Sequence, residues 1–344
     1  MIARGLLLCA LAALNGCFAA HYLAQATRGQ IEILERRRPI DDVIADGRTP
    51  AFAKAQLAEV GKVKRFAEAH GLSATQSYTR YADLKRDAAV WVVSASERLA
   101  FRSTTWWFPI VGRVPYLGWF RFADAARFAV ELQQQGLDVG LRPASAYSTL
   151  GWFEDPILST MLGKDDGALF DLVNTILHES LHATFYVPMR TDLSESVASF
   201  VGDELTRDYL DERYGKASAE RARYDADMRR SIERRQWMLD SKAALAEIFA
   251  SHEDDAEKQR QKGLVLGELR RKLGTKRVIN NATLAELQNY AGGQDELTEL
   301  LKCFDRDWPR FIAALREWAK ATPTFGSLKD QCPQGSTYSK VSPR

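Results

Sequence analysis

Two of the chain's five histidines, His178 and His182, lie four positions apart in the segment ILHESLHATFY, and Glu179 lies between them. Side chains four positions apart share one face of an α-helix, so both imidazoles can point at one metal ion. Glu179 follows the first histidine directly, which places its carboxylate beside the ion, where it can take a proton from an attacking water. The spacing therefore indicates a hydrolytic metal centre, and the alternative is a buried helix whose histidines only form hydrogen bonds.

A zinc centre with an open position for water needs a third protein ligand, and Glu195 is the candidate. The dipeptide Val187-Pro188 predicts the end of the histidine helix, because the residue before a proline is disfavoured in the α conformation. Asp192, or the threonine before it, can cap the next helix, so that Glu195 falls about one turn into it. A tight corner between the two helices would then bring Glu195 close to His182. Asp192 is the rival ligand, and a solvent-facing role for Glu195 is the other alternative.

Two tyrosines are candidates for stabilising the oxyanion of peptide hydrolysis. Tyr147 lies in the segment AYSTLG, and Tyr186 lies just after the histidine helix. For each of them the alternative is a packed aromatic ring with an exposed hydroxyl. The aromatic segment from Trp106 to Phe120 can supply an edge strand that pairs with a substrate backbone, or it can be ordinary sheet.

An aminopeptidase also needs a carboxylate that holds the amino group of its substrate. Several acidic residues are available and none is singled out by its spacing: Glu154, Asp155, Asp203 and Glu204. Asn280 and Asn281 can bind a substrate terminus, but capping of a helix that begins near Thr283 is the favoured interpretation.

Helices and strands of moderate length must position these residues. The expected elements are helices from Gln30 to about His70 with a break at Pro39, from Ala123 to Gly136 and from about Ala168 to Tyr186, short strands at 88–95 and 137–141, a loop at 144–156, and an almost entirely helical stretch from Asp192 to Lys320. Proline and glycine are dense between residues 106 and 120, which favours an edge strand or an irregular hairpin there.

The composition is that of a globular protein without a basic surface for nucleic acid. The chain has 344 residues, of which 46% are hydrophobic and 27% charged, and its formal net charge is +2. Basic residues are interspersed with acidic ones, so no electrostatic argument favours nucleic acid as a partner.

The N-terminal segment MIARGLLLCALAALNGC is typical of a lipoprotein signal peptide covering residues 1–17. One positive charge precedes an apolar run of ten residues, which is too short for a stable transmembrane helix but suits a secretory signal. The ending Leu-Asn-Gly-Cys resembles a bacterial lipobox, so Cys17 is expected to carry the lipid. The protein is then expected on the bacterial cell envelope, lipid-anchored to the membrane and facing the periplasm. A soluble secreted protein cut near Ala19 or Ala20 is the alternative.

Two cysteines, Cys303 and Cys332, remain after the signal segment. In an oxidising compartment they are expected to form a disulfide, which for a loop of about 30 residues stabilises a fold by roughly 3–4 kcal/mol. Two free thiols are the alternative.

Several distinctive segments together point to one protein family. They are YLAQATRGQIEILERRRPI, WWFPIVGRVPYLGWF, AYSTLGWFEDP, HESLH, SESVASFVG and INNATLAELQNY. With them the chain resembles the putative aminopeptidase family of bacterial envelope lipoproteins, a gluzincin-like group of HExxH zinc peptidases. The resemblance implies that His178, His182 and Glu195 are zinc ligands and that Glu179 is the catalytic base.

The chain departs from the family's pattern at three places. The family often has asparagine and phenylalanine where this chain has Ser194 and Leu193, cysteines where it has Trp107 and Arg113, and a longer polar residue at Thr184. None of these differences removes a ligand or the base.

The expected fold is α+β and zincin-like, with a small mixed sheet beside the HExxH helix and a mostly helical C-terminal part. Residues 18–212 would form the zinc peptidase core and residues 213–344 the helical region. The expected function is hydrolysis of peptides by zinc-activated water, most simply as an aminopeptidase. A zinc endopeptidase or an amidase acting on envelope proteins or cell-wall peptides, and a lipid-anchored binding protein with structural zinc, are the alternatives.

Overall fold

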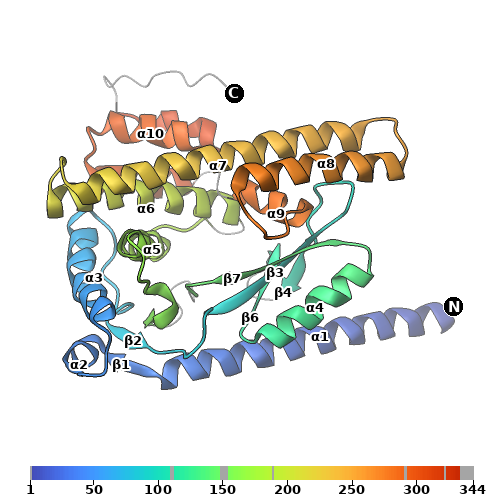
Figure 1. The fold of residues 1–344 in the computed structure, drawn as a ribbon, viewed down its shortest axis with the longest axis horizontal. Helices are drawn as coiled ribbons and strands as arrows, with labels where there is room; N and C mark the ends of the chain where they lie inside the picture. The colour runs from blue at the N-terminus through green and yellow to red at the C-terminus, as the bar shows by residue number, and fades with distance from the viewer. Residues whose placement is uncertain are drawn as a thin grey trace.

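The fold is mixed α+β and mostly helical, with small sheets (Figure 1). The computed structural model describes residues 2–108, 112–147, 154–187, 190–289, 293–320 and 323–333, with side chains from residue 18 onward except at 191, 288 and 289. The α-helices are α1 (Ile2–Glu35), α2 (Ile40–Ala45), α3 (Ala51–Ala69), α4 (Phe122–Gln134), α5 (Ala168–His182), α6 (Thr191–Tyr214), α7 (Ala219–Ala250), α8 (Asp255–Leu273), α9 (Asn281–Ala285), α10 (Gln294–Cys303) and α11 (Trp308–Ala319). Short 3-10 helices are η1 (Ser159–Met161), η2 (Glu286–Asn289) and η3 (Phe325–Gln331).

The strands form three small sheets within the described residues. They are β1 (Arg37–Pro39), β2 (Arg80–Ala82), β3 (Val90–Ser96), β4 (Trp106–Phe108), β5 (Gly112–Val114), β6 (Tyr116–Trp119), β7 (Asp138–Ala144) and β8 (Ile157–Leu158). The sheet orders are β1-β2-β8, β6-β3-β7 and the hairpin β4-β5. The aromatic segment at 106–120 thus gives a hairpin and an edge strand, as its prolines and glycines predict.

The sheet β6-β3-β7 is antiparallel throughout, and different helices cover its two faces. Successive residues of a strand point to opposite faces, so the apolar residues of β3 divide between two packing layers. One face packs against α4 and against α1 near Phe18 and Tyr22. The buried cluster there includes Val93, Leu117, Trp119 and Phe128. The other face is covered by α9, and Figure 1 places α1 and α4 on the side opposite α9.

A buried ion pair holds the C-terminal helices on the start of β7. Lys262 of α8 is 5% exposed, and its ammonium donates to the Asp138 carboxylate and to the carbonyl of Arg98. The Asn281 side chain donates to the carbonyl of Glu97 at 2.9 Å, and its backbone N–H donates to Asp138 at 3.0 Å. These bonds fix α9, and therefore η2 directly after it, over the sheet.

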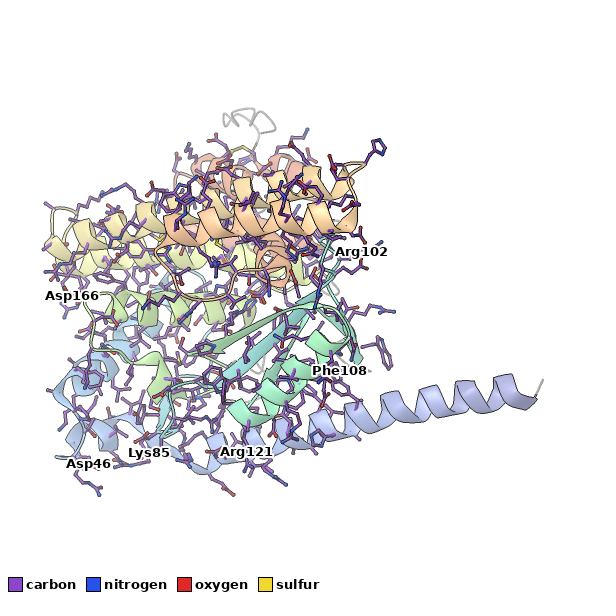
Figure 2. The ribbon with its side chains drawn as sticks, turned by 45° about the vertical axis from the view of Figure 1, so that its right-hand side comes forward. Asp46, Lys85, Arg102, Phe108, Arg121 and Asp166 are labelled. Atoms are coloured by element: carbon purple, nitrogen blue, oxygen red, sulfur yellow. A yellow bond between two sulfur atoms is a disulfide. The ribbon has the colours of Figure 1, made fainter. Side chains whose placement is uncertain are left out.

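The largest hydrophobic core surrounds α5. It joins α3, α5 and α6 with α10, α11 and η3, and its fully buried members include Ile176, Leu177, Val197, Phe311 and Trp318. The helices α7 and α8 form a long antiparallel pair with a separate small core against α9. Sparse apolar residues in a charged segment predict such a solvated helix pair, and the structure agrees. In Figure 2, α1 extends beyond the rest of the molecule at its N-terminal end.

The histidine helix is shorter than its sequence predicts. The expected end is near Tyr186, but α5 ends at His182. The backbone N–H groups of Thr184 and Phe185 both donate to the carbonyl of Leu181, which tightens the last turn, and the Thr184 hydroxyl accepts a hydrogen bond from the distant Ser73 backbone at 2.8 Å. A contact with a remote segment therefore ends the helix, and the local sequence does not reveal it.

Two other local predictions are confirmed. Helix α4 is followed by Gly136 with φ +83°, a backbone conformation that glycine adopts without strain. Asn280 caps α9, since its side chain accepts a hydrogen bond from the backbone of Thr283. Asn280 and Asn281 thus both have structural partners.

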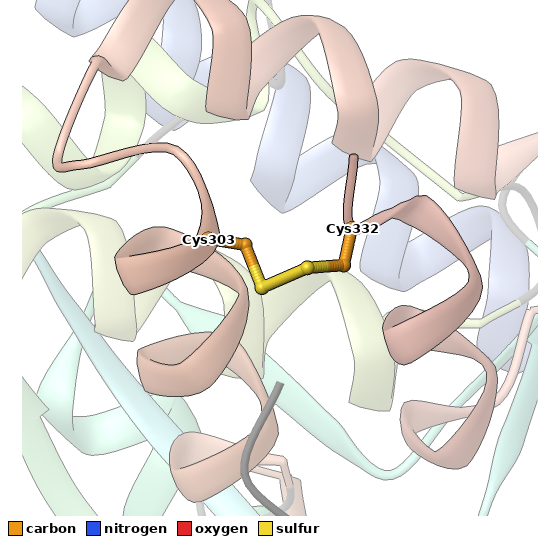
Figure 3. Close-up of a disulfide and its surroundings, with 2 residues drawn as sticks. All are labelled: Cys303 and Cys332. Atoms are coloured by element: carbon orange, nitrogen blue, oxygen red, sulfur yellow. A yellow bond between two sulfur atoms is a disulfide. The ribbon is translucent and has the colours of Figure 1, made fainter. Parts of the chain in front are cut away.

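A disulfide joins Cys303, at the end of α10, to Cys332, just after η3, with a Cα–Cα distance of 5.6 Å (Figure 3). It ties the last described segment of the chain to a helix that shares the main core. Among the described residues, no helix is both long and apolar enough to cross a membrane.

Candidate metal centre

A tight corner between α5 and α6 positions the candidate metal ligands. Helix α5 buries Ile176, Leu177 and Leu181 completely, which turns the face that carries the two histidines toward α6. At the corner the Ser194 hydroxyl accepts a hydrogen bond from the Val187 backbone at 3.0 Å. Ser194 is 1% exposed, so this short side chain fixes the entry of α6 from inside the core.

Three side chains of this corner converge on one point. The Nε2 atoms of His178 and His182 are 3.1 Å apart. The Glu195 carboxylate places one oxygen 3.4 Å from Nε2 of His178 and the other 3.6 Å from Nε2 of His182. Among the described residues, these three side chains form the group that can hold a metal ion.

The electrostatics of the group favour an ionised carboxylate. Burial acts to raise the pKa of Glu195, but hydrogen bonds and charge interactions with His178 and His182 outweigh it and lower that pKa to about 2. For His178, burial acts to lower the pKa, but the hydrogen bond to Glu195 and the negative charge of Glu179 raise it above its ordinary value. The site thus concentrates negative charge that a cation would neutralise.

The donor set and its spacing fit zinc. Two imidazole nitrogens and one carboxylate oxygen are ligands of catalytic zinc sites, which leave a fourth position open. Bonds of about 2.0–2.1 Å around a tetrahedral ion separate its ligand atoms by roughly 3.3 Å. The two imidazole nitrogens, 3.1 Å apart, match that value, and each of them lies 3.4 or 3.6 Å from a different oxygen of Glu195. With one ligand atom taken from each residue, the three atoms lie within 4.8 Å of one another. The Nδ1 atom of His182 is buried and has no hydrogen-bond partner among the described residues.

Glu179 lies beside the group and is not part of it. Its Oε2 atom is buried and makes no hydrogen bond within the described part of the chain. The phenol of Tyr78 is buried close by, and burial together with the charges of Glu179 and Asp155 raises the pKa of Tyr78 well above its ordinary value. A carboxylate oxygen without a partner, next to two converging imidazoles, is free to accept a proton.

Asp203 of α6 accepts a hydrogen bond from the histidine helix α5. The side chain of Asn174, one turn before His178, donates to the Asp203 carboxylate at 2.8 Å. Burial raises the pKa of Asp203, and the hydrogen bond from Asn174 acts against it. A Cβ added to the neighbouring Gly202 would lie 3.3 Å from Cβ of His178, so α5 and α6 approach closely at this point.

The two tyrosines favoured by the sequence have different surroundings. Tyr186 is 45% exposed and lies beyond the end of α5. Tyr147 packs its ring edge-on against Phe120 at 5.2 Å, and burial raises its pKa.

Tyr116 at the start of β6 is not among the residues that the sequence singles out, but its pKa responds to the charge of Glu195, one of the candidate ligands. Burial, followed by the charge of Glu195, raises its pKa to about 12, with smaller contributions from Glu286 and Glu179. The sequence indicates only that Tyr116 lies in an aromatic segment with a strand. It does not predict on which face of the sheet the Tyr116 side chain lies.

The carboxylates considered for holding an amino group have other positions or partners. Glu204 forms ion pairs with Arg207 and with Arg306. Asp155 is buried close to Tyr78, whose backbone N–H donates to its carbonyl at 2.6 Å, and Glu154 is exposed. Asp192, the rival ligand, is held by Arg190 through contacts of 2.9 and 3.0 Å. Cys17, expected to carry a lipid, lies outside the residues whose side chains are described.

The family comparison covers most of the chain. Residues 21–325 match the model of a family described as "Putative aminopeptidase". This range contains α5, α6 and all three members of the candidate metal group. No curated protein and no solved structure matches the chain.

Proposed function

This chain belongs to the "Putative aminopeptidase" family, and we propose from this that it is a zinc-dependent peptidase with a zincin-like active site, acting as an aminopeptidase. The convergence of His178, His182 and Glu195 supports the proposal most strongly, because two imidazoles and a carboxylate with an open side are the ligand set of hydrolytic zinc. The proposed substrates are peptides.

The chain's own residues would divide the work of hydrolysis. Zinc held by the three ligands supplies Lewis acidity, which activates water and polarises the scissile carbonyl. Glu179, whose Oε2 atom has no partner among the described residues, accepts the proton of the attacking water and can pass it to the leaving amine. Burial and the charge of Glu195 raise the pKa of Tyr116 to about 12, so its phenol stays protonated, and we assign it as a candidate hydrogen-bond donor to the developing oxyanion. No covalent acyl-enzyme is needed.

A peptide library would test this function directly. Purified protein that begins at Phe18 and is loaded with zinc should release single residues from the amino ends of peptides, as followed by mass spectrometry. Treatment with a chelator should abolish this release, and zinc should restore it. Cleavage at internal bonds would show that the protein is an endopeptidase and not an aminopeptidase. If the zinc-loaded protein cleaved no peptide, the assignment as a peptidase would be wrong.

The proposed location is the bacterial cell envelope, with a lipid on Cys17 as the membrane anchor. Two or more acyl chains hold a protein on a bilayer far more firmly than one chain does. Cys17→Ser should therefore release the protein from the membrane fraction or leave it with its signal segment uncleaved, as shown by fractionation and intact-mass measurement. Unchanged mass and unchanged membrane association would point to a different anchor.

A further inference from the structure

The disulfide between Cys303 and Cys332 joins two segments that both reach the helices of the metal ligands (Figure 3). One segment is α10, which ends at Cys303, and the other consists of α11 and η3, which lead to Cys332. Helix α10 packs against α6, and η3 packs against both α10 and α11. Together, α10, α11 and η3 form what we call the C-terminal module.

The module holds the turn that follows α5. Arg316 of α11 donates a hydrogen bond from Nε to the backbone carbonyl of Thr184 at 3.2 Å. Thr184 lies two residues after His182, which is the last residue of α5. The buried rings of Trp318 and Phe185 are stacked with their centroids 6.3 Å apart. The end of the histidine helix therefore rests against α11.

The module also contacts the start of α6 at two places. Arg190, the residue before α6, donates a hydrogen bond to the carbonyl of Pro323, which lies between α11 and η3, at 3.4 Å. Gln294, the first residue of α10, donates to the backbone carbonyl of Ser196 at 3.2 Å. Ser196 follows the candidate ligand Glu195 directly. Both sides of the α5–α6 corner are thus bound to the same module.

The position of α11 depends in turn on η3. The indole Nε1 of Trp318 donates to Oγ of Ser327 at 2.9 Å, and its ring stacks with that of Phe325 at 6.1 Å between centroids. The Phe325 ring also lies against the start of α10, because a Cβ added to Gly293 would overlap it. The disulfide joins the C-terminal ends of η3 and α10, so it closes the module opposite these contacts.

We propose that the Cys303–Cys332 disulfide sets the zinc affinity of the metal centre by holding the α5–α6 corner in the conformation in which the three ligands converge. His182 and Glu195 each lie within two residues of a carbonyl that the module binds. Without the disulfide, η3 can separate from α10, and the contacts to the corner loosen. Apparent affinity falls in proportion to the fraction of molecules that keep the binding conformation. The inference rests on the proposed zinc centre.

The first test compares the zinc affinity of the parent protein with that of the double variant Cys303→Ser/Cys332→Ser. Serine is close to cysteine in size, and the double variant has no free thiols at these positions that could bind zinc. Coupling between two sites of a protein is typically 5–150-fold, and we expect the double variant to bind zinc about tenfold more weakly. Competition with a chromogenic chelator would measure the affinity, and circular dichroism would show that the variant is folded.

Leu245→Ala is the matched control for general destabilisation. Leu245 is fully buried in the separate small core of α7, α8 and α9, so its truncation lowers the free energy of unfolding without touching the module. Zinc affinity of this variant should equal that of the parent while both are folded. If Leu245→Ala weakened zinc binding as much as the double variant, general destabilisation would explain the loss, and the inference would be wrong.

A further variant removes one contact of the module and keeps the disulfide. Arg316→Met has an unbranched side chain but no donor for the Thr184 carbonyl, and it should weaken zinc binding about threefold. Arg310→Met is its control, because Arg310 is an exposed arginine about two turns earlier on the same helix, with its guanidinium over the ring of Phe304. Zinc affinity should not change in this control.

The coupling must be reciprocal, so zinc must stabilise the disulfide by the same factor. In a glutathione redox buffer, two glutathione thiols reduce the protein disulfide to two cysteine thiols and become one glutathione disulfide. Saturating zinc should shift this equilibrium about tenfold toward the protein disulfide, which is about 30 mV for a two-electron couple. The shift should be absent in His182→Ala, which excludes zinc bound to glutathione or to the freed thiols as its cause.

The outcomes separate the inference from the proposed function. If the parent binds zinc but the double variant binds it equally well, or if zinc does not shift the disulfide equilibrium, the inference is wrong and the zinc centre stands. If the parent binds no zinc, the inference and the proposed function are both wrong. If the double variant does not fold, the comparison of Arg316→Met with Arg310→Met decides.

Discussion

Replacing Glu179 by glutamine should lower peptide hydrolysis by about two to four orders of magnitude while zinc content and the free energy of unfolding stay the same. Glu179 is not one of the three converging ligands, so its loss should not release the metal. The amide has nearly the same shape as the carboxylate but cannot accept a proton from water. Single-turnover rates, metal analysis and urea unfolding of the same preparation would measure the three quantities.

Asp171→Asn is the matched control for Glu179→Gln. Asp171 is an exposed carboxylate on the same helix, and it lies outside the metal group. Its substitution removes one negative charge from α5 without touching the proposed base, so activity should change less than twofold by a general electrostatic effect. If Glu179→Gln kept its activity, another residue would be the general base. The HExxH segment would then bind zinc without supplying the base.

The metal group could be predicted from the sequence because its geometry is local. The four-residue spacing of His178 and His182 fixes their common face on any helix, and the proline at 188 predicts a corner before Glu195. The structure brings these three side chains together even though α5 ends earlier than expected. The ligands tolerate this difference, because both histidines still lie within α5, with His182 as its last residue, and Glu195 lies within α6.

The placement of Tyr116 and its neighbours on the sheet could not be predicted, because it depends on the register of the strands. Tyr116, Ser94 and Glu286 are far apart in the sequence, and no spacing relates them. They meet because β6, β3 and β7 pair in one register and because Asn281 and the buried Lys262–Asp138 pair hold α9 over that face. Tyr116 therefore becomes a candidate only through its place in the sheet, and the roles of Tyr147 and Tyr186 stay predictions.

Replacing Glu195 by glutamine should weaken zinc binding at least about a hundredfold, because losing a residue that only supports a ligand already costs tenfold to a hundredfold. Its carboxylate supplies the negative charge among the three ligands and lies within 3.4 and 3.6 Å of the two imidazole nitrogens. Glutamine leaves two neutral imidazoles and a neutral amide. Competition titration with a chromogenic chelator would measure the affinity.

Two neighbouring variants show whether Glu195 acts as a ligand or only as a nearby charge. Asp192→Asn removes a carboxylate from the same turn of α6, but Asp192 is paired with Arg190 at 2.9 Å, so zinc affinity should change little. Glu195→Asp keeps the charge and shortens the side chain by about one bond, so its affinity should lie between those of the parent and of Glu195→Gln. If charge near the site alone mattered, Asp192→Asn would weaken binding as much as Glu195→Gln. If Asp192→Asn were the more damaging change, Asp192 would replace Glu195 as the third ligand, and the corner between α5 and α6 would have to rearrange on binding metal.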